Sequence, residues 1–273
     1  MDAGQALDPK ATQWYSLLRD RALSYSDLLA NLHNILLHAP ACTQLACEQL
    51  VDPMAIQDAH VLPFRYLDAI TDLVAFPGEA VRDVLMALAH AADLAVINVP
   101  VLPGKTLIGL DCTGSMSANK VGGKQYRCMD LASLFAATLY KSQEADLFLF
   151  GTKLGVYNPP KSVPVTAMAQ DLARRDMGAT RFDILFDAIQ GAAFYDRLLI
   201  LSDAEAQASM VAAETAFRRF RERHGPRPEV FVFDLSRDEG LLAPEVGLCY
   251  VHGFPEPILE VLKEGGRYGQ ARA

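Results

Sequence analysis

Oxygen-bearing side chains follow a short apolar run at every second position: Asp111, Thr113 and Ser115. Alternate side chains of an extended segment point the same way, so these three can share one small volume. A further threonine, Thr180, and a second carboxylate, Asp203, also stand beside the ends of predicted elements. Carboxylates mixed with hydroxyls suit a hard cation, and Mg²⁺ prefers octahedral oxygen coordination that includes water. The pattern therefore predicts a Mg²⁺ site with a position open to an outside ligand.

The elements expected to position these residues are strands that alternate with helices. Strands are predicted over residues 106–111, 145–150, 197–202, 229–234 and 248–251, and helices over 125–142, 166–174, 181–192, 208–223 and 256–263. This alternation indicates an α/β fold, a Rossmann-like, mostly parallel sheet with helices on both faces. Ligands of such sheets bind beyond the carboxyl ends of the strands. Asp111 and Asp203 stand at two of those ends, and Thr180 precedes a helix.

A simpler interpretation of the same residues stays open. Asp111 and Asp203 would then only cap helices or accept hydrogen bonds in turns. Cys112 alternates away from the oxygen side chains, so we expect a core thiol there and not a nucleophile. No G-x-S-x-G, P-loop or G-x-G-x-x-G motif occurs, and the six histidines show no ligand spacing. An enzyme is therefore the less favoured class, with a metal-dependent hydrolase as a weaker alternative.

The first hundred residues are predicted to be all helical. Apolar residues recur at spacings of three and four over residues 12–38, where a Leu-Ser-Tyr-Ser-Asp stretch favours two helices. Further helices are predicted over 41–51, 63–75 and 79–94. We therefore expect two domains, a helical segment over residues 1–100 and an α/β domain over residues 101–273.

Charge is divided unequally between these two parts. The chain of 273 residues has a formal charge of −8; residues 1–104 contain 5 Lys and Arg against 12 Asp and Glu, and residues 105–273 contain 20 against 21. Neutralising phosphates supplies most non-specific affinity for nucleic acid, so the bulk charge argues against RNA binding by this chain alone. Five cysteines without a C-x-x-C pair, no signal peptide and no long apolar run predict free thiols, no membrane span and a cytoplasmic location.

The five oxygen-bearing residues resemble the metal-ion-dependent adhesion site of von Willebrand factor type A domains. Asp111, Thr113 and Ser115 match the D-x-S-x-S motif of that family, with threonine in place of the first serine. Thr180 matches the family's isolated threonine, and Asp203 matches the aspartate that follows a later strand. The resemblance implies a von Willebrand A domain whose Mg²⁺ is completed by an acidic side chain or a phosphate from a partner.

A narrower resemblance extends over most of the chain. Residues 17–24, 28–32 and 59–70 are similar to the end of the TROVE helical-repeat domain of the Ro autoantigen family, and residues 248–262 are similar to the end of Ro proteins. Ro proteins are rings of helical repeats closed by a von Willebrand A domain, and they bind small RNAs. The resemblance implies a non-catalytic, Ro-like ribonucleoprotein component.

The chain departs from the Ro pattern in the length of its helical part. We expect only the last few helices of the repeat domain before the α/β part, and therefore expect most of the family's RNA-binding surface to be absent from these residues. We expect a protein partner to supply helical repeats, with RNA bound by the assembly and an apolar helical face covered by the partner. The alternative is a metal-dependent protein-interaction adaptor that binds no RNA.

Two groups of basic residues are candidates for contact with an anionic ligand. One closely follows the metal-site residues and would form a rim for an acidic or phosphate ligand: Lys120, Lys124 and Arg127. The other is a dense run that would contact RNA phosphates: Arg218, Arg219, Arg221 and Arg223. The interpretation that we favour makes this run the solvated face of a helix, with Phe217 and Phe220 turned to the sheet.

Overall fold

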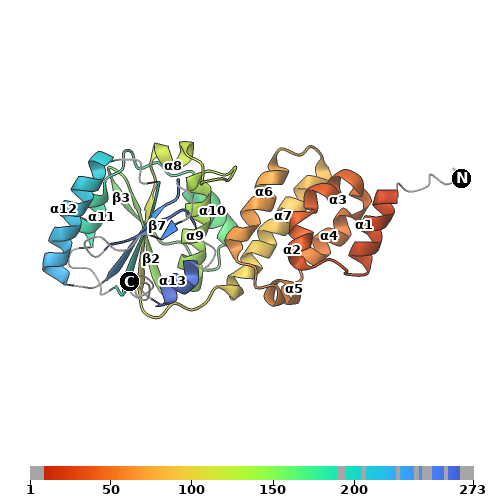
Figure 1. The fold of residues 1–273 in the computed structure, drawn as a ribbon, viewed down its shortest axis with the longest axis horizontal. Coiled ribbons are helices and arrows are strands. Elements are labelled where there is room, and N and C mark those ends of the chain that lie inside the picture. The colour runs from red at the N-terminus through yellow and green to blue at the C-terminus, as the bar shows by residue number, and fades with distance from the viewer. Residues whose placement is uncertain are drawn as a thin grey trace, which may run out of the picture. The chain divides into compact units, whose positions relative to one another are not determined.

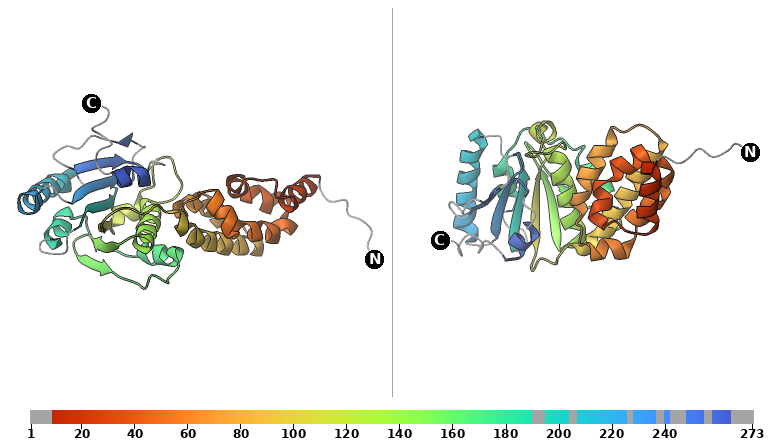
Figure 2. Two further views of the ribbon diagram at one scale, coloured as in Figure 1. Left: turned by 90° about the horizontal axis from the view of Figure 1, so that it is seen from below. Right: turned by 45° about the vertical axis from the view of Figure 1, so that its right-hand side comes forward.

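The structure, a computed structural model, describes residues 9–189, 195–203, 207–225, 228–236, 240–241, 248–254 and 258–264. The chain divides into two compact units, residues 1–98 and residues 99–273. Figures 1 and 2 show helices in the first unit, and a sheet with helices on both sides in the second. No described helix is both long and apolar enough to cross a membrane.

The described part of residues 1–98 forms helices only, which confirms the prediction of an all-helical segment. The helices are α1 (Pro9–Arg19), α2 (Tyr25–Ala30), α3 (Leu32–His38), α4 (Thr43–Leu50), α5 (Pro53–Asp58), α6 (Tyr66–Val74) and α7 (Glu79–Leu94), with 3-10 turns η1 (Pro40–Cys42), η2 (Pro63–Arg65) and η3 (Ala95–Asn98). The two helices predicted over 12–38 are three, because Asn31 ends α2 and its side chain donates to the Asp27 carbonyl at 2.8 Å. The short α5 was not predicted, although Asp52 and Pro53 are typical start signals.

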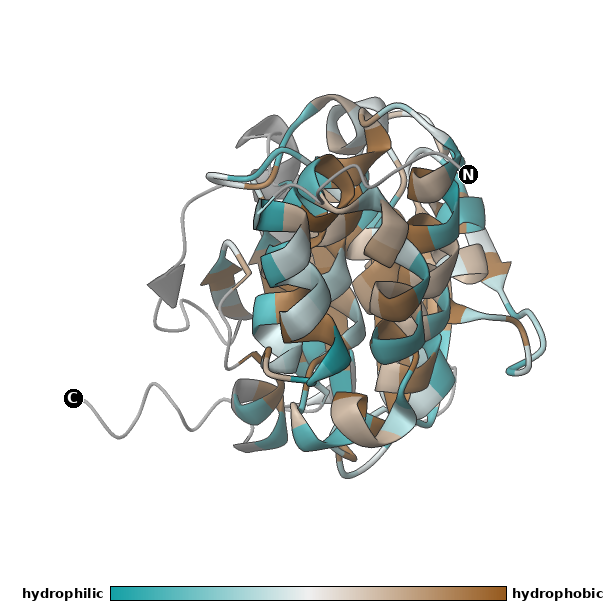
Figure 3. Cartoon of the chain, turned by 90° about the vertical axis from the view of Figure 1, so that its right-hand side faces the viewer, coloured by the Kyte–Doolittle hydropathy of each residue, from teal (hydrophilic) through white to brown (hydrophobic). Residues whose placement is uncertain are grey.

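An apolar face of α7 lies at the centre of the helical unit. Val84, Leu88 and Ala91 are buried at spacings of three and four, and α7 packs mainly on α4 and α6. Hydrophilic and hydrophobic bands alternate along the helices of this unit in Figure 3, as expected for helices with one buried face. The Tyr25 hydroxyl donates to the buried Leu50 carbonyl at 2.7 Å and so satisfies an acceptor at the end of α4.

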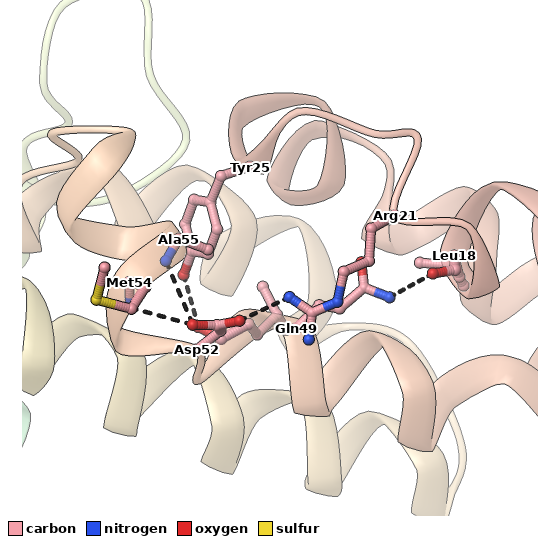
Figure 4. Close-up of polar contacts among 8 residues, drawn as sticks. Leu18, Arg21, Tyr25, Gln49, Asp52, Met54 and Ala55 are labelled. Carbon is pink, nitrogen blue, oxygen red and sulfur yellow. Dashed lines mark hydrogen bonds and ion pairs between the residues drawn. The ribbon is translucent and has the colours of Figure 1, made fainter.

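Three polar side chains tie the end of α1 to the junction of α4 and α5 (Figure 4): Arg21, Gln49 and Asp52. One Asp52 oxygen accepts two backbone N–H groups of the first turn of α5, at 3.1 and 3.3 Å, and thereby caps that helix. The other Asp52 oxygen accepts from Arg21 at 2.7 Å. Gln49 is buried and donates to the Leu18 carbonyl at 2.7 Å. Hydrogen bonds therefore hold the segment after α1 against the junction of α4 and α5.

Asp52→Ala is expected to lower the free energy of unfolding by about 1–2 kcal/mol, because it removes an N-cap. Arg21→Ala is the matched control and should lower it by less than about 1 kcal/mol, since the Arg21 side chain is 63% exposed. Urea titrations followed by circular dichroism measure both changes. Equal losses in the two variants would show that Asp52 contributes through the ion pair and not through the cap.

The described part of residues 99–273 contains a seven-stranded sheet in the order β3-β2-β1-β4-β5-β7-β6. The strands are β1 (Thr106–Asp111), β2 (Ala145–Phe150), β3 (Leu154–Tyr157), β4 (Arg197–Ser202), β5 (Glu229–Asp234), β6 (Gly240–Leu241) and β7 (Leu248–His252). The helices are α8 (Gly114–Ala118), α9 (Cys128–Ser142), α10 (Val165–Leu172), α11 (Phe182–Ala188), α12 (Gln207–His224) and α13 (Ile258–Glu264). All five predicted strands are present and parallel, which confirms the α/β class with a mostly parallel sheet.

Two strands and one helix of this unit were not predicted. β3 pairs antiparallel with β2, and β6 pairs antiparallel with β7, at the two edges of the sheet. Both are short and contain a glycine, Gly155 or Gly240, so neither shows the apolar run that marks a strand. The five-residue helix α8 was not predicted, because its residues belong to the segment that was interpreted as the metal site. Residues 190–192 and 256–257 of the predicted helices lie outside the described residues.

Both faces of the sheet are covered. Phe182 and Phe186 of α11 pack with Phe217 and Phe220 of α12 on one face, and α9 lies on the other with α10 beside it (Figures 1 and 2). Every residue of β1 and β4 is buried, as expected for central strands of a doubly wound sheet. The candidate site therefore lies at the ends of two fully buried central strands.

Candidate metal centre

The polar residues lie at the point where the strand order reverses. β1 lies between β2 and β4, and the chain proceeds from there toward opposite edges of the sheet, which makes the ends of β1 and β4 a topological switch point. Asp111 is the last residue of β1, and Ser202 is the last residue of β4 with Asp203 directly after it. The fold therefore brings two distant parts of the chain to one edge of the sheet.

All five residues of the predicted metal site are joined by oxygen–oxygen contacts. Thr180 Oγ1 lies 3.3 Å from Asp111 Oδ2 and 3.2 Å from Thr113 Oγ1. Thr113 Oγ1 lies 3.1 Å from Ser115 Oγ, which donates to Asp203 Oδ1 at 3.3 Å. These contacts are long for hydrogen bonds between oxygens, so the side chains hold one another only loosely.

Two further side chains belong to this network and were not predicted. Ser202 Oγ donates to Asp111 Oδ2 at 2.6 Å, and Asn119 Nδ2 donates to Asp203 Oδ2 at 2.9 Å. Each of them orients one of the two carboxylates. Ser202 could have been recognised as a polar residue at the end of an apolar strand, whereas Asn119 follows α8 and no spacing rule points to it.

Asp111 is fully buried, and its two carboxylate oxygens differ in their surroundings. Oδ2 accepts from Ser202, whereas Oδ1 is buried and has no hydrogen-bond partner among the described residues. Burial, with a smaller contribution from the charge of Asp203, raises the pKa of Asp111 to about 6 against the opposing effect of hydrogen bonds from Ser202, Thr113 and Thr180. A buried, ionised carboxylate is costly unless a cation compensates it. Carboxylate and hydroxyl oxygens in this arrangement fit a hard divalent ion such as Mg²⁺.

Hydroxyl oxygens supply three of the five candidate ligands. The described residues contain no group of three His, Cys, Asp or Glu that could hold a metal. Cys112 lies within the site segment but is fully buried, and burial raises the pKa of its thiol to about 12. Its thiol is therefore not ionised near neutral pH, as expected for a core cysteine and not for a nucleophile.

The candidate rim residues, Lys120, Lys124 and Arg127, are all exposed. The Arg127 guanidinium is paired with Asp130 through two contacts of 2.6 and 3.0 Å. Lys120 donates to Gln125 at 2.8 Å in an exposed contact, and Lys124 is exposed on the same segment. An anion that binds Arg127 would have to compete with Asp130.

Phe217 and Phe220 of α12 are each 1% exposed and pack in the core beside the sheet. Three of the arginines are exposed: Arg218, Arg219 and Arg223. Arg221 is half-buried, and its guanidinium lies 4.8 Å from the centre of the Phe217 ring. The exposed arginines are placed to meet phosphates, and they equally fit a solvated helix face.

Comparison with known proteins shows similarity to one family in both sequence and fold, although no family model matches the chain. The sequence is 25% identical over 217 residues to the RNA-binding protein RO60 of Deinococcus radiodurans, covering 74% of this chain and 40% of that protein. The structure matches the crystal structure of the Ro (RSR) protein of Deinococcus radiodurans with a TM-score of 0.72 and 19% identity. This chain is similar to Ro proteins.

The match extends over most of this chain but over only part of each Ro protein. The structural match covers 95% of this chain and 60% of the Ro (RSR) chain, so both units take part in it. The chain spans less than two thirds of the length of either Ro protein. The predicted resemblance to the Ro family is thereby confirmed.

Proposed function

We propose that this chain is a non-catalytic, Ro-like RNA-binding component whose α/β unit binds Mg²⁺ and presents the ion to an outside ligand. The observation that carries the proposal is the joined set of oxygens around Asp111. One carboxylate oxygen of Asp111 is buried and has no hydrogen-bond partner within the part of the chain that the structure describes. The similarity to a protein named for RNA binding supports the RNA part.

Five residues would hold the ion directly or through water: Asp111, Thr113, Ser115, Thr180 and Asp203. Hydroxyl ligands are neutral, so two carboxylates leave the ion electrophilic toward an anion from outside. Mg²⁺ usually keeps several water molecules, one of which an acidic side chain or a phosphate would replace. Lys120 and Lys124, both exposed, would add to the attraction for such an anion.

Calorimetric titration with Mg²⁺ is expected to show saturable binding of a single ion, and Mg²⁺ is expected to raise the thermal unfolding midpoint. Asp203→Ala should remove both effects, because it deletes one of the two carboxylates. Asp130→Ala is the matched control, since the Asp130 carboxylate is paired with Arg127 and belongs to no part of the network. Wild-type protein that shows no saturable binding would overturn the metal part of the proposal.

We further propose that RNA is bound by an assembly in which a second protein contributes helical repeats. Charge supports this, because residues 1–104 contain 5 Lys and Arg against 12 Asp and Glu and would repel phosphates by themselves. The helical unit also exposes large apolar side chains that a partner would cover: Tyr15, Leu37, Met54, Val74, Met86 and Ile97.

RNA binding is best tested on protein purified from cells together with its partners. Nuclease-sensitive RNA is expected to co-purify, and its affinity should fall steeply with salt. A clean monomer on size-exclusion chromatography, with neither partner nor RNA, would contradict the proposed assembly. Recovery of a protein partner without RNA would instead support a metal-dependent adaptor that binds no RNA.

A further inference from the structure

The loop that carries Thr180 is fixed by the backbone of Met177. Its N–H donates to the Cys112 carbonyl at 2.7 Å, directly beyond the end of β1. Its carbonyl accepts two hydrogen bonds from Thr152 just beyond the end of β2, one from the backbone N–H at 2.8 Å and one from the hydroxyl at 2.9 Å. Met177 thus joins the ends of two neighbouring strands, three residues before Thr180.

Two glycines make this close approach of backbones feasible. A Cβ on Gly151 would lie 2.5 Å from the Met177 carbonyl oxygen, so any other residue there would displace the loop. Gly178 has a φ of +89°, which side-chain-bearing residues rarely adopt, and a Cβ on it would lie 2.4 Å from Thr152 Oγ1. Its N–H donates to Asp176 Oδ1 at 2.9 Å, which stabilises the turn toward Thr180.

We propose that the Thr152 hydroxyl is a positioning group for the metal site: through the Met177 carbonyl it sets where Thr180 Oγ1 stands relative to Asp111 and Thr113. This inference rests on the proposed Mg²⁺ site and adds a residue outside it. Thr152 makes no contact with the five oxygen-bearing residues in any described hydrogen bond, so its effect on the ion must pass through the loop.

The position of Thr180 matters because its own contacts do not fix it. Its hydroxyl lies 3.2 and 3.3 Å from its two neighbours, so these weak contacts leave the loop to determine its place. Mg²⁺ requires ligand distances of about 2.0–2.1 Å in near-ideal octahedral geometry. A shift of about half an ångström in the loop would therefore weaken the site, in the way that losing an outer hydrogen bond lowers metal affinity by about 10–100-fold elsewhere.

The test compares Thr152→Val, which removes the hydroxyl but keeps the shape, with Thr152→Ser, which restores it. Calorimetric titration with Mg²⁺ is expected to show about 10-fold weaker binding for the valine variant and affinity within about 2-fold of wild type for serine. The metal-free unfolding midpoint of both should stay within about 2 °C of wild type. Thr166→Val, the same change in the first turn of α10, is the control and should bind Mg²⁺ normally.

Gly151→Ala provides a second, independent displacement of the Met177 carbonyl, should the valine variant not fold. It is expected to weaken Mg²⁺ binding at least as much as Thr152→Val. If wild-type protein binds Mg²⁺ and both Thr152→Val and Gly151→Ala bind it equally well, the inference is wrong while the proposed metal site stands. If the wild type shows no Mg²⁺ binding, the proposed metal site fails and the inference fails with it.

Discussion

Asp111→Asn is expected to make the metal-free protein more stable while it removes most of the affinity for Mg²⁺. Burial raises the pKa of Asp111 to about 6 from an ordinary value of 3.8. Folding therefore favours the protonated form of Asp111. The resulting contribution to the free energy of unfolding is fully present below pH 3.8 and is lost as the pH rises through about 6. At pH 7.5 the folded protein holds a buried charge that asparagine lacks, while asparagine can still accept the Ser202 hydrogen bond.

The expected gain is up to about 3 kcal/mol in the free energy of unfolding at pH 7.5, from about 1.4 kcal/mol for each unit of pKa shift. The gain should shrink toward zero as the pH falls from 6 to 4, because wild-type Asp111 then becomes neutral as well. Urea titrations of metal-free protein at pH 4.5, 6 and 7.5 measure this trend. Asp130→Asn serves as the comparison. The Asp130 carboxylate is paired with Arg127, so the protein should not become more stable when this charge is lost.

Loss of Mg²⁺ binding is the second half of the same expectation. Without the Asp111 charge, the affinity should fall by about 100-fold or more, since an outer-shell change alone costs about 10–100-fold. Mg²⁺ should then stabilise the wild type but not the variant. A variant that is destabilised at pH 7.5 and still binds Mg²⁺ would show that Asp111 serves the fold through its hydrogen bonds and not the ion through its charge.

Phe217→Ala is expected to destabilise the protein by about 3–5 kcal/mol, the largest loss that we expect from a single change in α12. The Phe217 ring is 1% exposed and lies 5.6 Å, centre to centre, from the Phe186 ring, so alanine leaves a cavity between α11 and α12. It also removes the ring that lies 4.8 Å from the Arg221 guanidinium. Thermal unfolding followed by circular dichroism measures the loss.

The matched control is the double variant Arg218→Ala and Arg219→Ala on the exposed side of the same helix. Each change should alter the free energy of unfolding by less than about 0.5 kcal/mol, as surface substitutions usually do. In the assembled complex, loss of two phosphate contacts should lower the salt dependence of RNA binding by about 1.4–1.8 in log–log slope. An unchanged slope would identify the arginine face as solvated surface without a part in RNA binding.

Elements with a strong local signal were predictable from the sequence. The five parallel strands are apolar runs that no competing pattern resembles, and the rule that ligands bind beyond strand ends led directly to Asp111 and Asp203. β3 and β6 were missed because edge strands need no apolar run when one side faces solvent. Asn119 and Thr152 were missed for another reason: each acts through a hydrogen bond to a residue far away in the chain, and no local pattern encodes such a contact.

The hydrogen bond between Ser202 and Asp111 has a consequence for kinetics, because it joins residues 91 positions apart. β1 can pair with β2 early, but the second carboxylate arrives only when β4 has crossed over and docked on the other side of β1. Closing a loop of this length costs chain entropy before the contact is made, so we expect this contact to form late in folding. An ion held between the two strand ends would therefore stabilise the native state but not the transition state for folding. Mg²⁺ is expected to slow unfolding while it leaves the folding rate almost unchanged.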